Sequence, residues 1–210
     1  MDLTPLHSTA HIWYALVMTA VPKHKMTADE FLAWVETLPS EAGKFELWDG
    51  EVVVRHGPGG LEEGELAQHW DAKGAMFVAL REAIARARLP CFAAVDGPMV
   101  RLSPSRMARP DLLVYCGPKV SRMTREVLNP IILVEVLSPS TEKRDHGVKR
   151  EGYFTLSGLA HYIIIDPDRP LVIHHKRGAA NAVGTEILTG ARLRLEPPGL
   201  DVDLTEVLAS

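Results

Sequence analysis

Cysteine is scarce in this sequence. Only Cys91 and Cys116 occur among the 210 residues, and both lie in apolar runs. Their separation does not match the spacing of metal ligands, and no further cysteines are present to build a disulfide framework. We therefore expect two buried, reduced thiols.

Long hydrophobic segments are also missing. The apolar run at 12–18 is too short to span a bilayer, and no segment rich in Lys and Arg precedes it as in a secretory signal. The glycine-rich loop at 57–60 lacks the Gly-Lys-Ser/Thr ending of a phosphate-binding loop. We expect a cytoplasmic protein with no membrane partner and no nucleotide cofactor.

An excess of positive charge is the third absence. The chain carries 23 Lys and Arg against 27 Asp and Glu, a formal net charge of −4, and its pI is about 6.1. Such a chain has no global cationic field of the kind that binds nucleic acid non-specifically. Basic residues are nevertheless dense in one stretch, at Arg101, Arg106, Arg109, Lys119, Arg122 and Arg125.

The hydrophobic content suffices for a folded core. It amounts to 46% of the chain, which fits one globular domain at this length. We predict that residues 26–210 form this domain and that residues 1–25 are an N-terminal extension. Thr27 and Glu30 have the spacing of a capping box, so a helix is predicted from this point to about residue 38.

Turn signals and periodicity predict the next elements. The dipeptide Asp49-Gly50 predicts a β-hairpin, and Asp96-Gly97 predicts a second one between the strand-like runs on either side of it. A long helix is predicted over 61–88, with Trp70 and Val78 on its buried side.

Central strands are predicted where apolar runs are nearly continuous. Such runs occur at 112–116, 131–137 and 162–165, and a helical segment at 145–156 follows the second. This order of elements predicts an α/β fold with a mixed central sheet flanked by helices.

An acid, Glu135, interrupts the second of these runs. A carboxylate inside an apolar strand is costly unless it is paired, protonated or bound to a metal. Asp111 precedes the first run, so the two acids can lie side by side on neighbouring strands. Two close carboxylates repel each other unless a divalent cation lies between them, and oxygen ligands suit Mg²⁺ or Mn²⁺. The alternatives are a turn role for Asp111 and a salt bridge from Glu135 to Lys149 or an arginine.

A lysine follows on the predicted helix at 145–156. Lys149 lies four residues after Asp145 and four before Tyr153, so these three residues share one helical face. Its ammonium could hold a water or stabilise negative charge above the acids. The alternative is an ordinary Asp–Lys pair on a solvated face.

Several of these residues together resemble the Uma2 family, endonucleases of the PD-(D/E)XK nuclease superfamily. The residues that carry the resemblance are Pro110, Asp111, the run Val134-Glu135-Val136-Leu137-Ser138-Pro139-Ser140, Asp145, Lys149, Tyr153, Gly158 and Tyr162-Ile163-Ile164-Ile165-Asp166-Pro167. The helix after Thr27 and the segment Phe45-Glu46-Leu47-Trp48-Asp49-Gly50-Glu51 extend it towards the N-terminus.

The resemblance implies a restriction-endonuclease-like core and a set of site residues. Asp111, Glu135 and the backbone carbonyl of Val136 would hold Mg²⁺ or Mn²⁺, and Glu46 would be an upstream acid of the site. The superfamily pattern has a lysine two residues after the second acid, where this chain has Leu137. By the resemblance, Lys149 on the following helix takes that place.

Three histidines complete the candidates. His69 is at a position where such proteins often carry a histidine, so it and Tyr153 are candidates for lining the cleft, whereas a lone helical histidine is more often a core or surface residue. His174 and His175 are adjacent on a predicted strand, so they point to opposite faces and make a poor metal pair.

The leading hypothesis is a metal-dependent endonuclease that hydrolyses phosphodiester bonds, with DNA as the expected substrate and a homodimer as the expected assembly. One alternative keeps the fold as a non-catalytic interaction module with a structural pair between Glu135 and Lys149. Another is hydrolysis of a different phosphoester.

Overall fold

The computed structural model describes residues 21–39, 42–56, 67–121, 123–137 and 145–209. The chain divides into two compact units, Met1–Gly64 with Arg101–Arg109 and Glu65–Val100 with Pro110–Ser210. Most of the predicted N-terminal extension and the first part of the predicted helix at 61–88 lie outside the described residues. No helix in the described part of the chain is long and apolar enough to cross a membrane.

The first unit begins with the predicted capped helix. Helix α2 spans Ala28–Thr37, and Thr27 is its N-cap. The Thr27 hydroxyl oxygen accepts a hydrogen bond from the Glu30 amide at 3.3 Å, and the Glu30 carboxylate accepts one from the Thr27 amide at 2.7 Å. This reciprocal pair is the capping box that the sequence predicts.

A four-stranded sheet completes the first unit, in the order β2-β1-β5-β4. Its strands are β1 (Lys44–Trp48), β2 (Glu51–His56), β4 (Val100–Ser103) and β5 (Arg106–Ala108). Strands β1 and β2 form the first predicted hairpin. Asp49 and Gly50 have φ values of 52° and 85° at the turn, which a two-residue hairpin connection requires.

The second unit is built on a six-stranded sheet in the order β10-β9-β8-β7-β6-β3. Its strands are β3 (Cys91–Val95), β6 (Leu112–Cys116), β7 (Pro130–Val136), β8 (His161–Asp166), β9 (Leu171–Arg177) and β10 (Val183–Leu188). Strands β7 and β8 are parallel, and the other neighbours are antiparallel. Helix α4 (Asp145–Tyr153) lies between the two parallel strands in sequence, as a parallel crossover requires.

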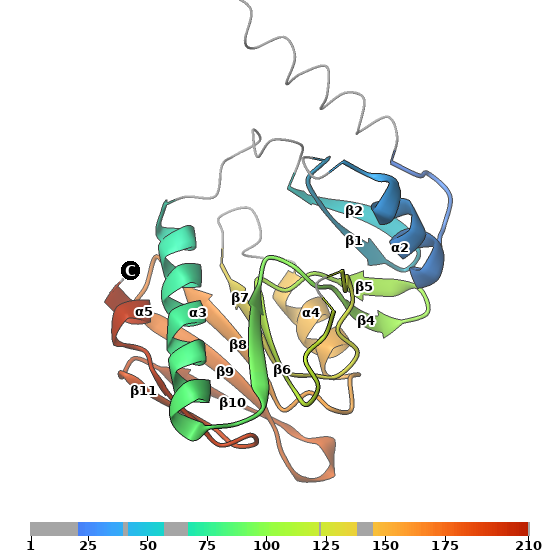
Figure 1. Ribbon diagram of the computed structural model, residues 1–210. Helices are drawn as coiled ribbons and strands as arrows, with labels where there is room; N and C mark the ends of the chain where they lie inside the picture. The colour runs from blue at the N-terminus through green and yellow to red at the C-terminus, as the bar shows by residue number, and fades with distance from the viewer. Residues whose placement is uncertain (1–20, 40–41, 57–66, 122, 138–144, 210) are drawn as a thin grey trace, which may run out of the picture. The chain divides into compact units, whose positions relative to one another are not determined.

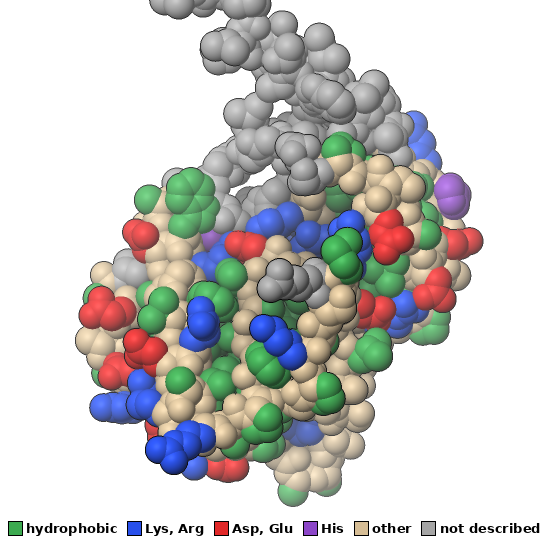
Figure 2. Space-filling view, in the orientation of Figure 1, with side chains coloured by type: hydrophobic (Ala, Val, Ile, Leu, Met, Phe, Trp, Pro, Cys, Tyr) green, Lys and Arg blue, Asp and Glu red, His purple; other side chains and the backbone are tan. Residues whose placement is uncertain are grey.

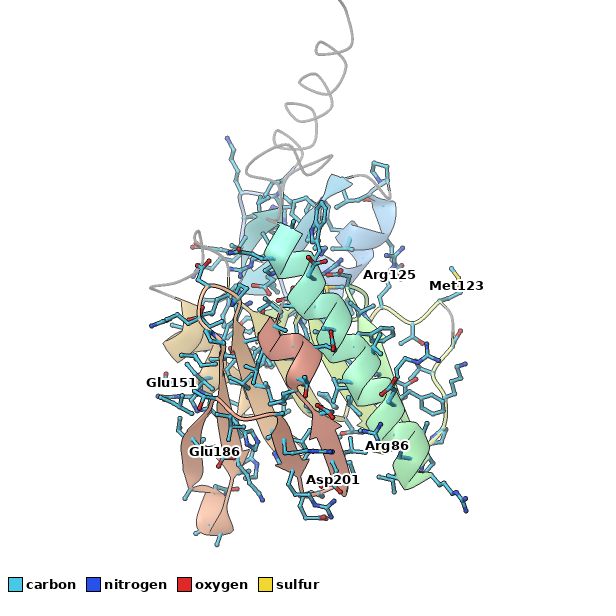
Figure 3. All side chains as sticks on the ribbon, turned by 90° about the vertical axis from the view of Figure 1, so that its left-hand side faces the viewer. Arg86, Met123, Arg125, Glu151, Glu186 and Asp201 are labelled. Carbon is cyan, nitrogen blue, oxygen red and sulfur yellow. A yellow bond between two sulfur atoms is a disulfide. The ribbon has the colours of Figure 1, made fainter. Side chains whose placement is uncertain are left out.

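Helices α3 (Ala67–Ala87) and α4 lie on opposite faces of this sheet (Figure 1). Ile163 and Ile165 belong to the core that α3 covers, whereas Tyr162, the residue before Ile163, packs edge-on against Tyr153 of α4. The hairpin of β11 (Arg192–Leu195) and β12 (Leu200–Asp203) and the helix α5 (Thr205–Ala209) complete the α3 side; Figure 3 shows α5 beside α3. The predicted mixed sheet flanked by helices is confirmed.

The cysteine prediction is wrong, because Cys91 and Cys116 form a disulfide. The two residues are opposite each other on the antiparallel strands β3 and β6, with Cα atoms 3.9 Å apart. This register is set by the folded sheet and not by the spacing of the cysteines in the sequence.

The second predicted hairpin is also wrong. Strand β3 pairs with β6 in the six-stranded sheet, whereas β4 belongs to the four-stranded sheet. Asp96 does adopt a turn conformation, with φ of 51°, but its amide donates to the carbonyl of Asp111 at 3.0 Å. The turn is therefore bonded to the residue that precedes β6, and the chain leaves the sheet there.

Trp70 and Val78 do not lie on the buried side of α3; their side chains are 59% and 54% exposed. The buried residues of this helix recur at helical spacing as His69, Ala72, Lys73, Met76, Ala79, Leu80, Ala83 and Ile84. Trp70 and Val78 fall outside that stripe, which instead includes a histidine and a lysine.

Candidate active site

The carboxylate of Asp111 lies beside the end of β7. Leu112 pairs with Val134 in the antiparallel ladder, so the preceding residue, Asp111, lies opposite Glu135, the residue before Val136. One carboxylate oxygen of Asp111, Oδ2, accepts a hydrogen bond from the Val136 amide at 2.8 Å. The Asp111 side chain thus accepts the Val136 amide, which in a continued antiparallel ladder would donate to the backbone of the neighbouring strand. This bond fixes the first acid at the carboxyl end of the strand that carries the second.

Glu135 points to the face covered by α4. Its side chain is buried, and Oε1 accepts hydrogen bonds from Lys149 Nζ at 3.0 Å and from the Tyr153 hydroxyl. Lys149 and Tyr153 lie four residues apart on α4, so one helical face delivers both donors to one oxygen. The salt bridge that the sequence left open as an alternative is therefore present. The side chain of Asp145 lies outside the described part of the structure.

His69 of α3 contacts the backbone at Val136, next to both acids. Its Nε2 atom lies 3.1 Å from the Val136 carbonyl oxygen and 3.9 Å from Asp111 Oδ2. A carbonyl only accepts hydrogen bonds, so Nε2 carries the proton. The structure thus brings one predicted cleft residue to the carbonyl predicted as a metal ligand.

Two charged residues of this cluster were not singled out from the sequence. Lys73 is buried on α3, and its Nζ lies 3.2 Å from Asp111 Oδ1 and 3.0 Å from Asp96 Oδ1. Lys73 is four residues after His69, so the helical spacing of these two residues was the signal that could have identified it.

Glu46 belongs to the first unit and is fully buried there. Its carboxylate accepts hydrogen bonds from the Trp48 indole nitrogen at 2.9 Å and from the Arg109 amide at 2.9 Å. Arg55 lies 3.6 Å away and contributes positive charge. These contacts give Glu46 a defined structural role within its own unit.

The oxygen donors of the second unit fit Mg²⁺ or Mn²⁺ in kind. Asp111 and Glu135 offer carboxylate oxygens and Val136 a carbonyl oxygen, all hard ligands of the type these cations prefer. No group of three or more His, Cys, Asp or Glu side chains within the described ranges is arranged to hold a metal ion. Each acid contacts a lysine instead, at 3.0 Å and 3.2 Å.

The basic stretch noted in the sequence is partly neutralised. Arg101 forms an ion pair with Asp29 at 2.8 Å, and Arg106 forms one with Asp49 at 2.6 Å. The face shown in Figure 2 carries acidic and basic side chains close together. These two arginines therefore contribute less positive potential than their number in the sequence indicates.

A second buried polar cluster lies at the start of β8, at the end of the strand away from Val136. His161 Nε2 lies 2.6 Å from the Pro197 carbonyl, so it donates, and His161 Nδ1 lies 2.8 Å from His174 Nε2. His174 Nδ1 lies 2.7 Å from a carboxylate oxygen of Glu186, a residue labelled in Figure 3. Burial lowers the pKa of His161 to about 4, against the opposing effect of the bond to Pro197. His175 points to the other face, against Tyr162, as predicted for neighbours on a strand.

The pKa of His174 is also lowered. Burial is the main cause, and the hydrogen bond and the charge of Glu186 oppose it.

The sequence model of the Uma2 family, described as "Putative restriction endonuclease", matches residues 28–208. Among individual proteins, "Uncharacterized protein slr1290" of Synechocystis sp. is 32% identical over 92 residues, which are 43% of this chain and 48% of that protein. The chain thus matches about half the length of this relative.

A solved structure has the same fold. It is the crystal structure of "a putative nuclease belonging to DUF820 from Anabaena variabilis ATCC 29413", with a TM-score of 0.64. The match covers 88% of this chain and 98% of the other, at 16% sequence identity. At that identity, the likeness establishes the fold alone.

Proposed function

Since the chain belongs to the Uma2 family, we propose that it is a metal-dependent endonuclease that hydrolyses phosphodiester bonds in nucleic acid, with DNA as its substrate. The observation that carries the proposal is the convergence at the end of β7. Asp111 is bonded to the Val136 amide, His69 approaches the Val136 carbonyl, and Lys149 contacts Glu135. Acids, a carbonyl and a lysine are the groups that this chemistry uses.

In this proposal Asp111, Glu135 and the Val136 carbonyl hold Mg²⁺ or Mn²⁺. The bound cation would polarise the scissile phosphate and lower the pKa of a bound water. Lys149 is held at Glu135 by an ion pair of 3.0 Å, so its ammonium is positioned to orient the attacking water or to offset negative charge in the transition state. Tyr153 fixes the shared Glu135 oxygen from the same helix.

The proposal has two further parts, the role of Glu46 and the assembly. Glu46 as an upstream acid rests on the family resemblance, since its described contacts lie within the first unit. A homodimer rests on the two strands of the proposed substrate; sedimentation should then give a species of twice the chain's 23.1 kDa mass.

The activity test is incubation of purified protein with supercoiled plasmid and with single-stranded DNA, in Mn²⁺ and in EDTA. We expect nicking or linearisation in Mn²⁺ only, and at least a 100-fold lower rate for Asp111→Asn, since loss of one key charged group costs on the order of 3 kcal/mol of transition-state stabilisation. The matched control is Asp201→Asn, which removes the same charge from an exposed residue of β12. Equal cleavage by parent and Asp111→Asn would reject the assignment.

A non-catalytic module is the second candidate function. The observation that favours it is that Asp111 and Glu135 are each paired with a buried lysine, as structural acids would be. This reading predicts no cleavage in any metal, together with unchanged DNA binding in Asp111→Asn.

A further inference from the structure

Lys73 forms an ion pair with Asp111, whose carboxylate is a ligand in the proposed metal site. Its side chain is 4% exposed, and its Nζ lies 3.2 Å from Asp111 Oδ1. The other oxygen, Oδ2, accepts the Val136 amide at 2.8 Å. Both oxygens of Asp111 are therefore in contact with donors, and one of these donors carries a full positive charge.

A divalent cation at Asp111 and the Lys73 ammonium would be close like charges. Such charges repel strongly in a partly buried site, because few waters are present to screen them. A cation can therefore bind Asp111 at full strength only if the ammonium moves off that carboxylate. Lys149 contacts the other proposed ligand, Glu135, from the opposite face of the sheet, and in the proposed function it stays beside the site to orient water.

Asp96 provides the place to which Lys73 can move. Lys73 Nζ lies 3.0 Å and 3.3 Å from the two oxygens of Asp96, so it already contacts both oxygens of that carboxylate. The Asp96 amide donates to the Asp111 carbonyl at 3.0 Å, which keeps the two acids together. The side chain of Asp96 is 40% exposed, so that side of the pair is open to water.

We infer that Lys73 is a positioning residue that holds Asp111 in the metal-free protein and competes with the divalent cation for it, with Asp96 as the partner that retains the displaced ammonium. This inference rests on the proposed function, because it assumes that Asp111 is a metal ligand. It adds a residue of α3 that sets how tightly the site takes its cation.

Mn²⁺ binding measured by calorimetry tests the inference without any turnover. We expect Lys73→Met to bind Mn²⁺ at least about tenfold more tightly than the parent, because the competing charge is gone. Lys176→Met is the matched control, since Lys176 is exposed and pairs in register with His161, at the end of β8 away from the site. It should bind Mn²⁺ as the parent does.

Lys73→Gln guards against a folding defect, since its amide can still bond to both acids while the charge is removed. It should also bind Mn²⁺ more tightly. Binding that Asp111→Asn abolishes, but that neither Lys73 variant strengthens, would overturn the role of Lys73 and leave the proposed site intact. Binding that Asp111→Asn does not change, or no binding by any variant, would overturn the proposed metal site and the inference with it.

Discussion

The two acids at the end of β7 are paired in different ways. Glu135 and Lys149 have side chains only 9% and 2% exposed, and Tyr153 contacts the same carboxylate oxygen. Asp111 is 15% exposed and shares Lys73 with Asp96, which is 40% exposed. The first pair is enclosed, whereas the second is open to water on one side. The enclosed pair of Glu135 and Lys149 should keep a fixed geometry. Lys73, which is shared between two acids and open to water on one side, should change partners more easily.

Loss of Lys149 should have the largest effect on stability. Lys149→Met leaves the buried Glu135 carboxylate without its cation, which typically costs about 3–5 kcal/mol. Urea unfolding monitored by circular dichroism measures this as a drop in the free energy of unfolding.

The double variant Glu135→Leu/Lys149→Met is the control for this prediction. It removes both charges from the enclosed site, so it should be clearly more stable than Lys149→Met alone. A single Lys149→Met variant as stable as the parent would show that the Glu135 pair is not enclosed in solution.

Removal of the Tyr153 hydroxyl should have an intermediate effect on the free energy of unfolding. Tyr153→Phe deletes one hydrogen bond to a buried carboxylate, and such bonds contribute about 1.5–3 kcal/mol. The ring and its edge-on contact with Tyr162 remain. Thermal unfolding should show a lower midpoint for this variant. Tyr115→Phe is a matched control, because the hydroxyl of Tyr115 accepts a hydrogen bond from a neutral backbone amide, that of Val120, at 3.3 Å.

Much of this enclosed site could be predicted from sequence. Glu135 was conspicuous as an acid within an apolar strand, and the spacing of Lys149 and Tyr153 placed both on one helical face. The open pair was harder to predict. Lys73 lies in a long helix of mixed composition, and Asp96 in a turn predicted to join a hairpin. Only the pairing of β3 with β6 brings that turn to Asp111.

Loss of Lys73 should destabilise the metal-free protein less than loss of Lys149. We expect about 1 kcal/mol for Lys73→Met, because water can solvate Asp96 and part of Asp111 once the ammonium is gone. The same urea titration measures both variants. An effect as large as that of Lys149→Met would contradict the contrast between an enclosed and an open pair.

The pH dependence of stability should report a different region, the buried histidines. The pKa of His161 is about 4 in the folded state and 6.5 in the unfolded chain. Between these values the unfolded state binds more protons, so stability falls as the pH is lowered from 6.5 towards 4, by at most about 1.4 kcal/mol per pH unit. His161→Gln should have a shallower slope over this range. An unchanged slope would contradict a neutral, buried His161.

The wrong predictions share a physical cause. The disulfide between Cys91 and Cys116, the separation of β3 from β4 and the exposure of Trp70 all depend on which strands and faces meet in three dimensions. Local signals such as the capping box at Thr27 and the Asp49-Gly50 turn were sufficient because their partners lie within a few residues.

The central claim is that Asp111 and Glu135 hold a divalent cation, and a Mn²⁺ titration of the unfolding free energy tests it most directly. At a concentration 100 times the dissociation constant, a ligand specific to the folded state adds about 2.7 kcal/mol of stability. We predict this gain for the parent and its loss in Asp111→Asn and Glu135→Gln. A parent whose stability does not respond to Mn²⁺, or variants that gain as much as the parent, would contradict the claim.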